Sequence, residues 1–352
     1  MRARATRLAM PLQTGWRCGS SRVTATSSPL LSTFTEWWED VVDNPCVQIL
    51  MAVYNGEQYL REQIESIRNQ TYGHWELLVS DDCSSDGSLA ILREYEAMDQ
   101  RIHVVLDGER YGGAKRHFMA LIRLSTADYV MTCDQDDVWD EDKVELTLVA
   151  MRNYEQIRVG KPLLVCTDLR VVDQNLAQLS PSFLSYSGMD ASKLTMGYFL
   201  ASCVVTGCTM MLNAPALELC QETVNEDALI MHDWWASLVV AAFGEVIHLD
   251  RATISYRQHG DNSVGADRFT VARALAALDQ KRDTARATFA QVEEFRRVFG
   301  DRLGTTESQM VDTYLSLRDA SALERLVGLG RCDAWKHGAL RNLGEALTFA
   351  TL

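Results

Sequence analysis

Short apolar runs alternate with amphipathic stretches from residue 46 onward. Residues 46–53 form an apolar run of strand length, and a Tyr-Asn-Gly turn signal follows it. In the next segment Leu60, Ile64 and Ile67 recur at helical spacing among charged residues. This stripe predicts an amphipathic helix that ends near Asn69.

The same alternation continues as far as residue 133. It predicts strands at 75–80, 102–106 and 129–133 and helices over 89–95 and 118–122. A rhythm of strand, helix and strand favours an α/β fold with a doubly wound, mostly parallel sheet flanked by helices. In such sheets, ligands gather at the carboxyl ends of the strands. The polar clusters at 54–57, 81–86 and 134–137 each follow a predicted strand.

The second half of the chain is less regular. Strands are expected at 163–172 and 204–212, a helix at 233–243, and two short strands at 246–249 and 252–256 around a turn at Asp250. After residue 265 the composition becomes helical. We therefore divide the chain into an extension at 1–45 that is disordered or not native, an α/β domain at 46–265 and a helical C-terminal region at 266–352.

Composition narrows the class of protein. The chain has 352 residues, of which 47% are hydrophobic, and this predicts a folded protein. Its net charge of −14 argues against a nucleic-acid partner that needs a broad basic surface. The nine cysteines contain no C-x-x-C pair and are read as reduced thiols. No apolar run reaches the roughly 18 residues of a membrane span.

Asp134 and Asp136 are candidate metal ligands. On an extended chain, residues two apart project from one face, with Gln135 pointing away. Two close carboxylates favour a hard divalent cation such as Mg²⁺ or Mn²⁺. The alternative is an acidic turn in which Asp137 caps the next helix.

A second acidic group follows the strand at 75–80. Asp82 is a candidate for accepting hydrogen bonds from a nucleobase or a ribose. An Asx turn with a helix cap is the alternative, and it explains Asp86 better than Asp82. We therefore interpret Asp86 as structural.

Four ordered motifs resemble those of family 2 nucleotide-sugar glycosyltransferases, which have the GT-A fold. They are Val53-Tyr54-Asn55-Gly56, Asn69-Gln70-Thr71-Tyr72, Asp81-Asp82-x-Ser84-x-Asp86 and Asp134-Gln135-Asp136-Asp137-x-Trp139. Later motifs resemble the bacterial rhamnosyltransferase branch: Thr206-Gly207-Cys208, Met231-His232-Asp233-Trp234-Trp235 and Tyr256-Arg257-Gln258-His259-Gly260.

The resemblance implies transfer of a sugar from a nucleoside diphosphate to a hydroxyl of a polysaccharide or glycolipid, with a donor such as deoxythymidine-diphosphate rhamnose. In this resemblance Asp82 binds the nucleobase of the donor, and Asp134 and Asp136 bind its ribose and the metal ion. Further contacts to the nucleotide are assigned to Tyr54, Glu57 and Lys115. The implied location is cytoplasmic, with a peripheral contact at the inner membrane face as an extension. The competing functions are a non-catalytic nucleotide-sugar-binding or assembly subunit and, less favoured, a sugar nucleotidyltransferase.

Asp233 is the candidate general base, because the matching acidic position is the base in the family; a helix N-cap is its other interpretation. Arg257 is a candidate diphosphate partner and His259 a third metal ligand, the alternative for His259 being a polar turn.

Trp234 and Trp235 are candidates for stacking on the acceptor sugar. Adjacent helix positions diverge by about 100 degrees, so at most one of them faces the site. For either ring, a place in the core is the competing interpretation.

Overall fold

The computed structural model describes residues 44–106, 108–259, 278–336 and 339–352. Nearly all of the extension expected at 1–45 lies outside these residues, and so does the expected boundary at 265–266. From Pro45 onward the chain clusters as one compact unit. The described part of the C-terminal region belongs to this unit.

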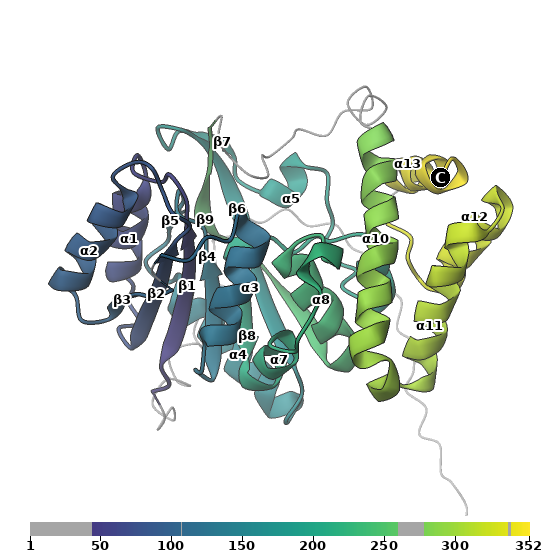
Figure 1. Ribbon diagram of the computed structural model, residues 1–352, viewed down its shortest axis with the longest axis horizontal. Coiled ribbons are helices and arrows are strands. Elements are labelled where there is room, and N and C mark those ends of the chain that lie inside the picture. The colour runs from purple at the N-terminus through teal and green to yellow at the C-terminus, as the bar shows by residue number, and fades with distance from the viewer. Residues whose placement is uncertain (1–43, 107, 260–277, 337–338) are drawn as a thin grey trace, which may run out of the picture. The chain divides into compact units, whose positions relative to one another are not determined.

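The first half of the chain builds the parallel part of the sheet, and it matches the predicted alternation. The strands lie in the order β3-β2-β1-β4, and all three pairings are parallel. Their bounds are β1 Val47–Val53, β2 Trp75–Asp81, β3 Ile102–Val104 and β4 Tyr129–Cys133. The connecting helices are α1 Leu60–Arg68, α2 Ser88–Met98 and α3 Ala114–Leu124, shown in purple and blue in Figure 1.

The second half extends this sheet with mixed pairing. Strand β8 is antiparallel to both β4 and β6, β9 is parallel to β6, and β5 is antiparallel to β9. The short β7 pairs with β6. The bounds are β5 Val138–Trp139, β6 Leu163–Asp173, β7 Gln178–Ser180, β8 Met211–Asn213 and β9 Glu245–Gln258. The predicted α/β class is confirmed, with a sheet that is mixed beyond β4.

Two strand predictions were wrong in detail. Only Met211–Asn213 of the expected strand at 204–212 is extended, because residues Gly207–Thr209 form a 3₁₀ turn, η1. The backbone N–H and hydroxyl of Thr209 both donate to the Thr206 carbonyl and close this turn. The two short strands expected at 246–256 are one strand, β9, whose pairing with β6 shifts register around Asp250.

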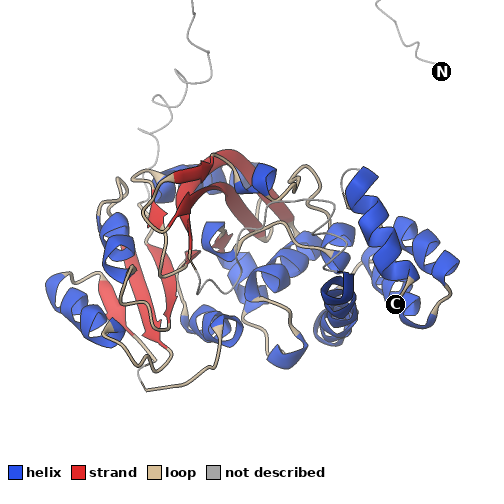
Figure 2. Ribbon diagram, turned by 90° about the horizontal axis from the view of Figure 1, so that it is seen from above, coloured by secondary structure: helices blue, strands red, loops and turns tan. Residues whose placement is uncertain are grey.

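Side-chain caps explain where several later helices begin. Ser182, Thr195 and Asn213 each accept a hydrogen bond from the backbone N–H three residues on, at the starts of α5, α6 and α7. The helix bounds are α4 Lys143–Ile157, α5 Phe183–Tyr186, α6 Met196–Ala201, α7 Ala214–Cys220, η2 Glu226–Ala228 and α8 His232–Phe243. Figure 2 shows helices on both faces of the sheet.

The C-terminal region is helical, as predicted, and packs on the catalytic fold. Phe295 and Phe299 of α10 lie about 6 Å from Trp235 of α8, measured between ring centroids. The helices are α10 Leu278–Phe299, α11 Thr305–Ser316, α12 Ala322–Arg331 and α13 Ala339–Ala350, with short turns η3 Gly300–Arg302 and η4 Leu317–Asp319 between them.

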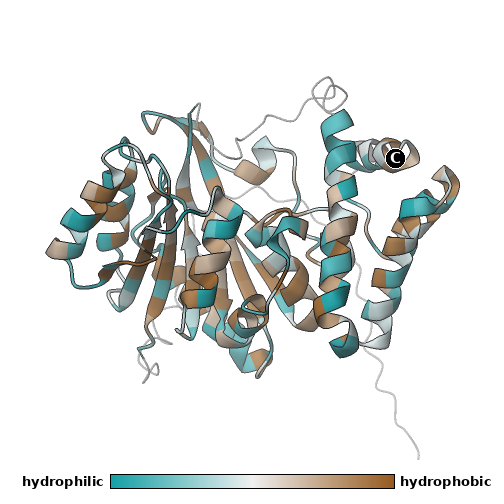
Figure 3. Cartoon of the chain, in the orientation of Figure 1, coloured by the Kyte–Doolittle hydropathy of each residue, from teal (hydrophilic) through white to brown (hydrophobic). Residues whose placement is uncertain are grey.

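Apolar side chains fill both faces of the sheet. On β1, Ile49 and Met51 belong to one core cluster and Leu50 to the other, as the period of two in a strand requires. The central strands are accordingly hydrophobic along their length, whereas α10 carries hydrophilic bands (Figure 3). Within the described residues, no helix is both long and apolar enough to cross a membrane.

Candidate functional site

A cavity of about 510 Å³ lies at the carboxyl ends of β1, β2 and β4. The turn η1 and the start of α8 form its other walls. Four carboxylates that are far apart in the sequence line it: Asp82, Asp134, Asp136 and Asp233. The predicted convergence of the acidic motifs is therefore present in the structure, because parallel strands end at the same edge.

Asp82 holds the loop that forms one rim of the cavity. It is only 4% exposed, and its two carboxylate oxygens accept the backbone N–H groups of Tyr111, Gly112 and Gly113. Gly112 and Gly113 have φ values of 71° and 145°, a region that glycine enters easily. Asp82 thus lines the cavity and also fixes the backbone of this loop.

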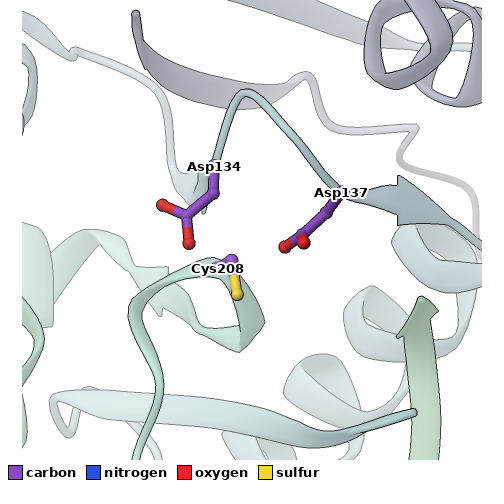
Figure 4. A group of neighbouring side chains, drawn as sticks. All are labelled: Asp134, Asp137 and Cys208. Carbon is purple, nitrogen blue, oxygen red and sulfur yellow. The ribbon is translucent and has the colours of Figure 1, made fainter. Parts of the chain in front are cut away.

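The loop after β4 carries the densest group of acidic side chains. Gln135 does not point away, as expected, but hydrogen-bonds both the N–H and the carbonyl of Tyr54 at the end of β1. Asp134 and Asp137 point toward Cys208 of η1, and one ligand atom from each of the three lies within 4.8 Å of the others (Figure 4). Asp137 does not cap a helix, because the two-residue strand β5 follows it.

The carboxyl groups of this loop are buried, and burial disfavours their charged form. Desolvation, followed by the charge of Asp136, raises the pKa of both Asp134 and Asp137. One carboxylate oxygen of Asp137, Oδ2, has no hydrogen-bond partner among the described residues. A hard divalent cation would satisfy such oxygens, so the residues present fit a metal ion.

His259 lies beside this group, as the sequence suggested. Its Nε2 is 2.9 Å from Oδ2 of Asp136, and its ring packs on Tyr59 with centroids 4.9 Å apart. Asp136 and His259 are therefore close enough to bind one ion, whereas the side chains that converge with Asp134 are those of Asp137 and Cys208. The thiol of Cys208 is fully buried, and desolvation raises its pKa, which favours the protonated form over a metal-binding thiolate.

Arg257 has a structural role that the sequence did not reveal. Its guanidinium donates to the carbonyls of Asp136 and Gln174 and to Glu62, and its backbone N–H donates to Asp137. The side chain is almost fully buried and does not line the cavity. The prediction that it contacts a diphosphate was wrong: it fixes the acidic loop from behind.

Asp233 lies in the first turn of α8, one residue after the helix begins. Its Oδ1 accepts the N–H of Trp234 at 2.6 Å. Burial raises its pKa to about 6, and nearby backbone N–H groups oppose this shift. A carboxylate that titrates near neutral pH is suited to take a proton from a hydroxyl.

The two tryptophans that follow are core residues. Trp235 is fully buried, and Trp234 is 9% exposed, with its Nε1 donating to the Phe199 carbonyl. Neither ring presents a face to the cavity, and neither is among its lining residues. The prediction that they stack on an acceptor sugar was wrong, because tertiary packing on α10 and α6 covers them.

Two further nucleotide contacts were misplaced. Glu57 accepts the backbone N–H of Gly87, and Lys115 donates to the Leu229 carbonyl, and neither lines the cavity. Tyr54 does line it, and so does Arg110, the only Lys or Arg among the described lining residues. Arg110 precedes the Tyr-Gly-Gly loop that Asp82 holds. Nothing in the local sequence indicates that its side chain lines the cavity.

Two buried histidines were also missed as site residues. His117 and His232 line the cavity with less than 5% of their surface exposed. His232 directly precedes Asp233, and that adjacency was the available signal.

Comparison with known proteins agrees with this geometry. A family model described as glycosyl transferase family 2 matches residues 48–208. Residues 48–208 are therefore a glycosyl transferase family 2 domain. This span holds Asp82, Asp134 and Asp136, whereas His232 and Asp233 lie beyond it.

Two curated relatives illustrate the similarity. The dTDP-rhamnosyl transferase RfbG of Shigella flexneri is 28% identical over 62% of this chain and 74% of its own length. The glucosyltransferase WfgD of Escherichia coli, named as acting with UDP-Glc on a GlcNAc-diphosphoundecaprenol, is 34% identical over 31% of this chain. That alignment covers 42% of WfgD, so the chain spans less than half the length of some relatives it matches.

Solved structures support the fold. TarS of S. aureus has a TM-score of 0.50 and 14% identity, over 77% of this chain and 43% of TarS. Its 1–349 fragment, in a complex with UDP, has the same score and covers 86% of this chain and 87% of that fragment. This likeness confirms the GT-A fold of the chain.

Proposed function

We propose that this chain is a metal-dependent, inverting glycosyltransferase that moves a sugar from a nucleoside diphosphate to a hydroxyl of a polysaccharide or glycolipid. The observation that carries the proposal is the convergence of Asp82, Asp134, Asp136 and Asp233 on one cavity. The similarity to RfbG, a dTDP-rhamnosyl transferase, favours dTDP-rhamnose as the donor.

The residues that line or border the cavity have separate roles in this proposal. Asp134, Asp136 and His259 would hold Mg²⁺ or Mn²⁺, which when bound neutralises the charge that develops on the leaving diphosphate. Tyr54 and the loop held by Asp82 flank the nucleotide. Arg110 takes the place predicted for Lys115, since a guanidinium at the rim can pair with a phosphate.

Asp233 completes the chemistry as general base. Inverting transfer requires the acceptor hydroxyl to lose its proton as its oxygen attacks the anomeric carbon. Asp233 lines the cavity from the start of α8, a different element from the acidic loop. It can therefore accept this proton while the acidic loop faces the diphosphate.

The location and the acceptor extend the proposal. A lipid-linked acceptor would place the enzyme on the cytoplasmic face of the inner membrane as a peripheral protein. Leu343 and Leu347 of α13 are exposed, and Phe349 is buried among the C-terminal helices. Membrane contact through this helix stays a prediction.

A thermal-shift screen tests the proposal. With Mn²⁺ present, dTDP-rhamnose, UDP-glucose and GDP-mannose are each added to the protein, and at least one should raise its melting temperature. The shift should disappear with EDTA and in Asp136→Asn, because the cation links the diphosphate to the acidic loop. Asp250→Asn, whose carboxylate lies outside this cavity, is the matched control and should keep the shift. No shift with any nucleotide sugar would contradict the proposal.

A further inference from the structure

The buried ring of His232 has unused hydrogen-bonding capacity inside the cavity. It is 4% exposed and lines the cavity at the start of α8. Among the residues that the structure describes, neither Nδ1 nor Nε2 has a hydrogen-bond partner. Buried polar atoms are nearly always paired in native proteins. Two such atoms on one ring are therefore candidates for pairing with a bound ligand.

Two neighbours define the surroundings of this ring. Phe118 of α3 stacks on it, with the ring centroids 4.2 Å apart. Gly207 lies next to its Nε2, where an added Cβ would be only 2.7 Å from that atom. Glycine at 207 therefore leaves room for the imidazole.

His232 and the proposed base face the same point. The Cβ position above Gly207 that lies 2.7 Å from Nε2 of His232 lies 3.6 Å from Oδ2 of Asp233. Burial lowers the pKa of His232 to about 3, so the imidazole is neutral and offers one donor and one acceptor. This pairing capacity suits a sugar hydroxyl, which also donates and accepts.

We propose that His232 hydrogen-bonds a hydroxyl of the donor sugar, and that this contact lets the cavity distinguish a nucleotide sugar from the nucleoside diphosphate alone. The inference rests on the proposed function. It assigns His232 to the donor and not to the acceptor because His232 is the more buried of the two neighbours. An acceptor approaching Asp233 would cover a donor that is already bound beneath it.

Binding calorimetry in the presence of Mn²⁺ tests the proposal, with dTDP and dTDP-rhamnose as the probes. In His232→Phe, which keeps a planar ring but has no ring nitrogen, the affinity for dTDP should change less than twofold. The affinity for dTDP-rhamnose should fall about tenfold, because one hydrogen bond to the sugar is lost. His232→Gln should recover part of this loss, since its amide also donates and accepts.

His248→Phe is the matched control. His248 is also partly buried with an unpaired Nε2, but it lines a different cavity, so this variant should bind both probes normally. Circular dichroism melts of all variants report folding.

Equal affinity for dTDP-rhamnose in wild type and His232→Phe would overturn the role of His232. An equal loss for both probes would also overturn it, because it would indicate a general distortion of the cavity. A wild-type protein that binds neither probe, nor any nucleotide sugar in the thermal-shift screen, would overturn the proposed function and this inference with it.

Discussion

At the scale of single residues, aspartates in and near this cavity have different roles according to their surroundings. Asp86 accepts hydrogen bonds from Ser88 and Glu57, which lower its pKa and keep it a structural carboxylate. Asp233 is more deeply buried, and its pKa is raised to about 6. Environment, more than residue type, makes Asp233 the carboxylate suited to exchange a proton near neutral pH.

This difference predicts a pH dependence of turnover. A base must be deprotonated to act, so kcat/KM should rise between pH 5 and pH 7, with a midpoint near 6, and then level off. The measurement is release of dTDP from dTDP-rhamnose at saturating Mn²⁺. Asp233→Asn should lower the rate about a hundredfold or more while dTDP still binds.

The control for this experiment is Asp227→Asn, an exposed carboxylate on η2 that is paired with Arg116. It should keep both the rate and its pH profile. A profile that is flat from pH 5 to pH 7 would contradict the assignment of Asp233 as the base.

At the scale of elements, the site depends on how the end of β9 supports the loop between β4 and β5. Arg257, near the end of β9, donates to the carbonyls of Asp136 and Gln174 and to Glu62. The loop that carries the proposed metal ligands has no regular structure of its own between Cys133 and Val138. Its shape therefore depends on this buried side chain.

Arg257→Lys should loosen the loop and lower stability. An ammonium group cannot reach all three acceptors, and we expect a loss of about 3 kcal/mol in the free energy of unfolding. Most of this comes from carbonyls left without a donor, because Glu62 is half exposed and its ion pair is weakened by solvent. Denaturant titration measures the loss, and Mn²⁺-dependent binding of dTDP should weaken in parallel.

Arg251→Lys on the same strand provides the comparison. Arg251 is half exposed and paired with Asp142, so its replacement should change the free energy of unfolding by less than about 0.5 kcal/mol. A similar small change for Arg257→Lys would show that the loop is held by other contacts.

At the scale of the whole molecule, the helical C-terminal region and the catalytic fold share a core. Phe289, Val292, Phe295 and Phe299 of α10 belong to the same buried cluster as Trp235 and Leu50. Trp235 of α8 lies two residues after the proposed base. Packing of α10 therefore also determines where the start of α8 lies.

Phe295→Ala tests this shared core. Removing a fully buried ring should lower the free energy of unfolding by about 3–5 kcal/mol and keep a single transition by both tryptophan fluorescence and circular dichroism. Leu323→Ala, at a site that is 72% exposed, should change it by less than about 0.5 kcal/mol. Two separate transitions, with the catalytic part unaffected, would contradict a shared core.

Some of the wrong predictions have a common physical cause. Residues 246–256 were predicted as two strands because Asp250 interrupts the apolar pattern. In the structure they form one strand, and the pairing of β9 with β6 shifts register at this point. Arg257 was assigned to the diphosphate because it follows an apolar strand. An arginine at such a position has the same local sequence whether its side chain contacts a ligand or the protein. Local sequence does not specify such long-range partners.

The sequence by itself determined the alternation of β1 to β4 with their helices and the position of acidic motifs at the strand ends, because periodicity and turn residues act over a few positions. Only the tertiary structure decided which side chains face the cavity. His232, Asp233 and Arg110 meet there with residues up to about 180 positions earlier in the chain. Their exposure depends on the packing of α3, η1 and α10, and no local pattern encodes that packing.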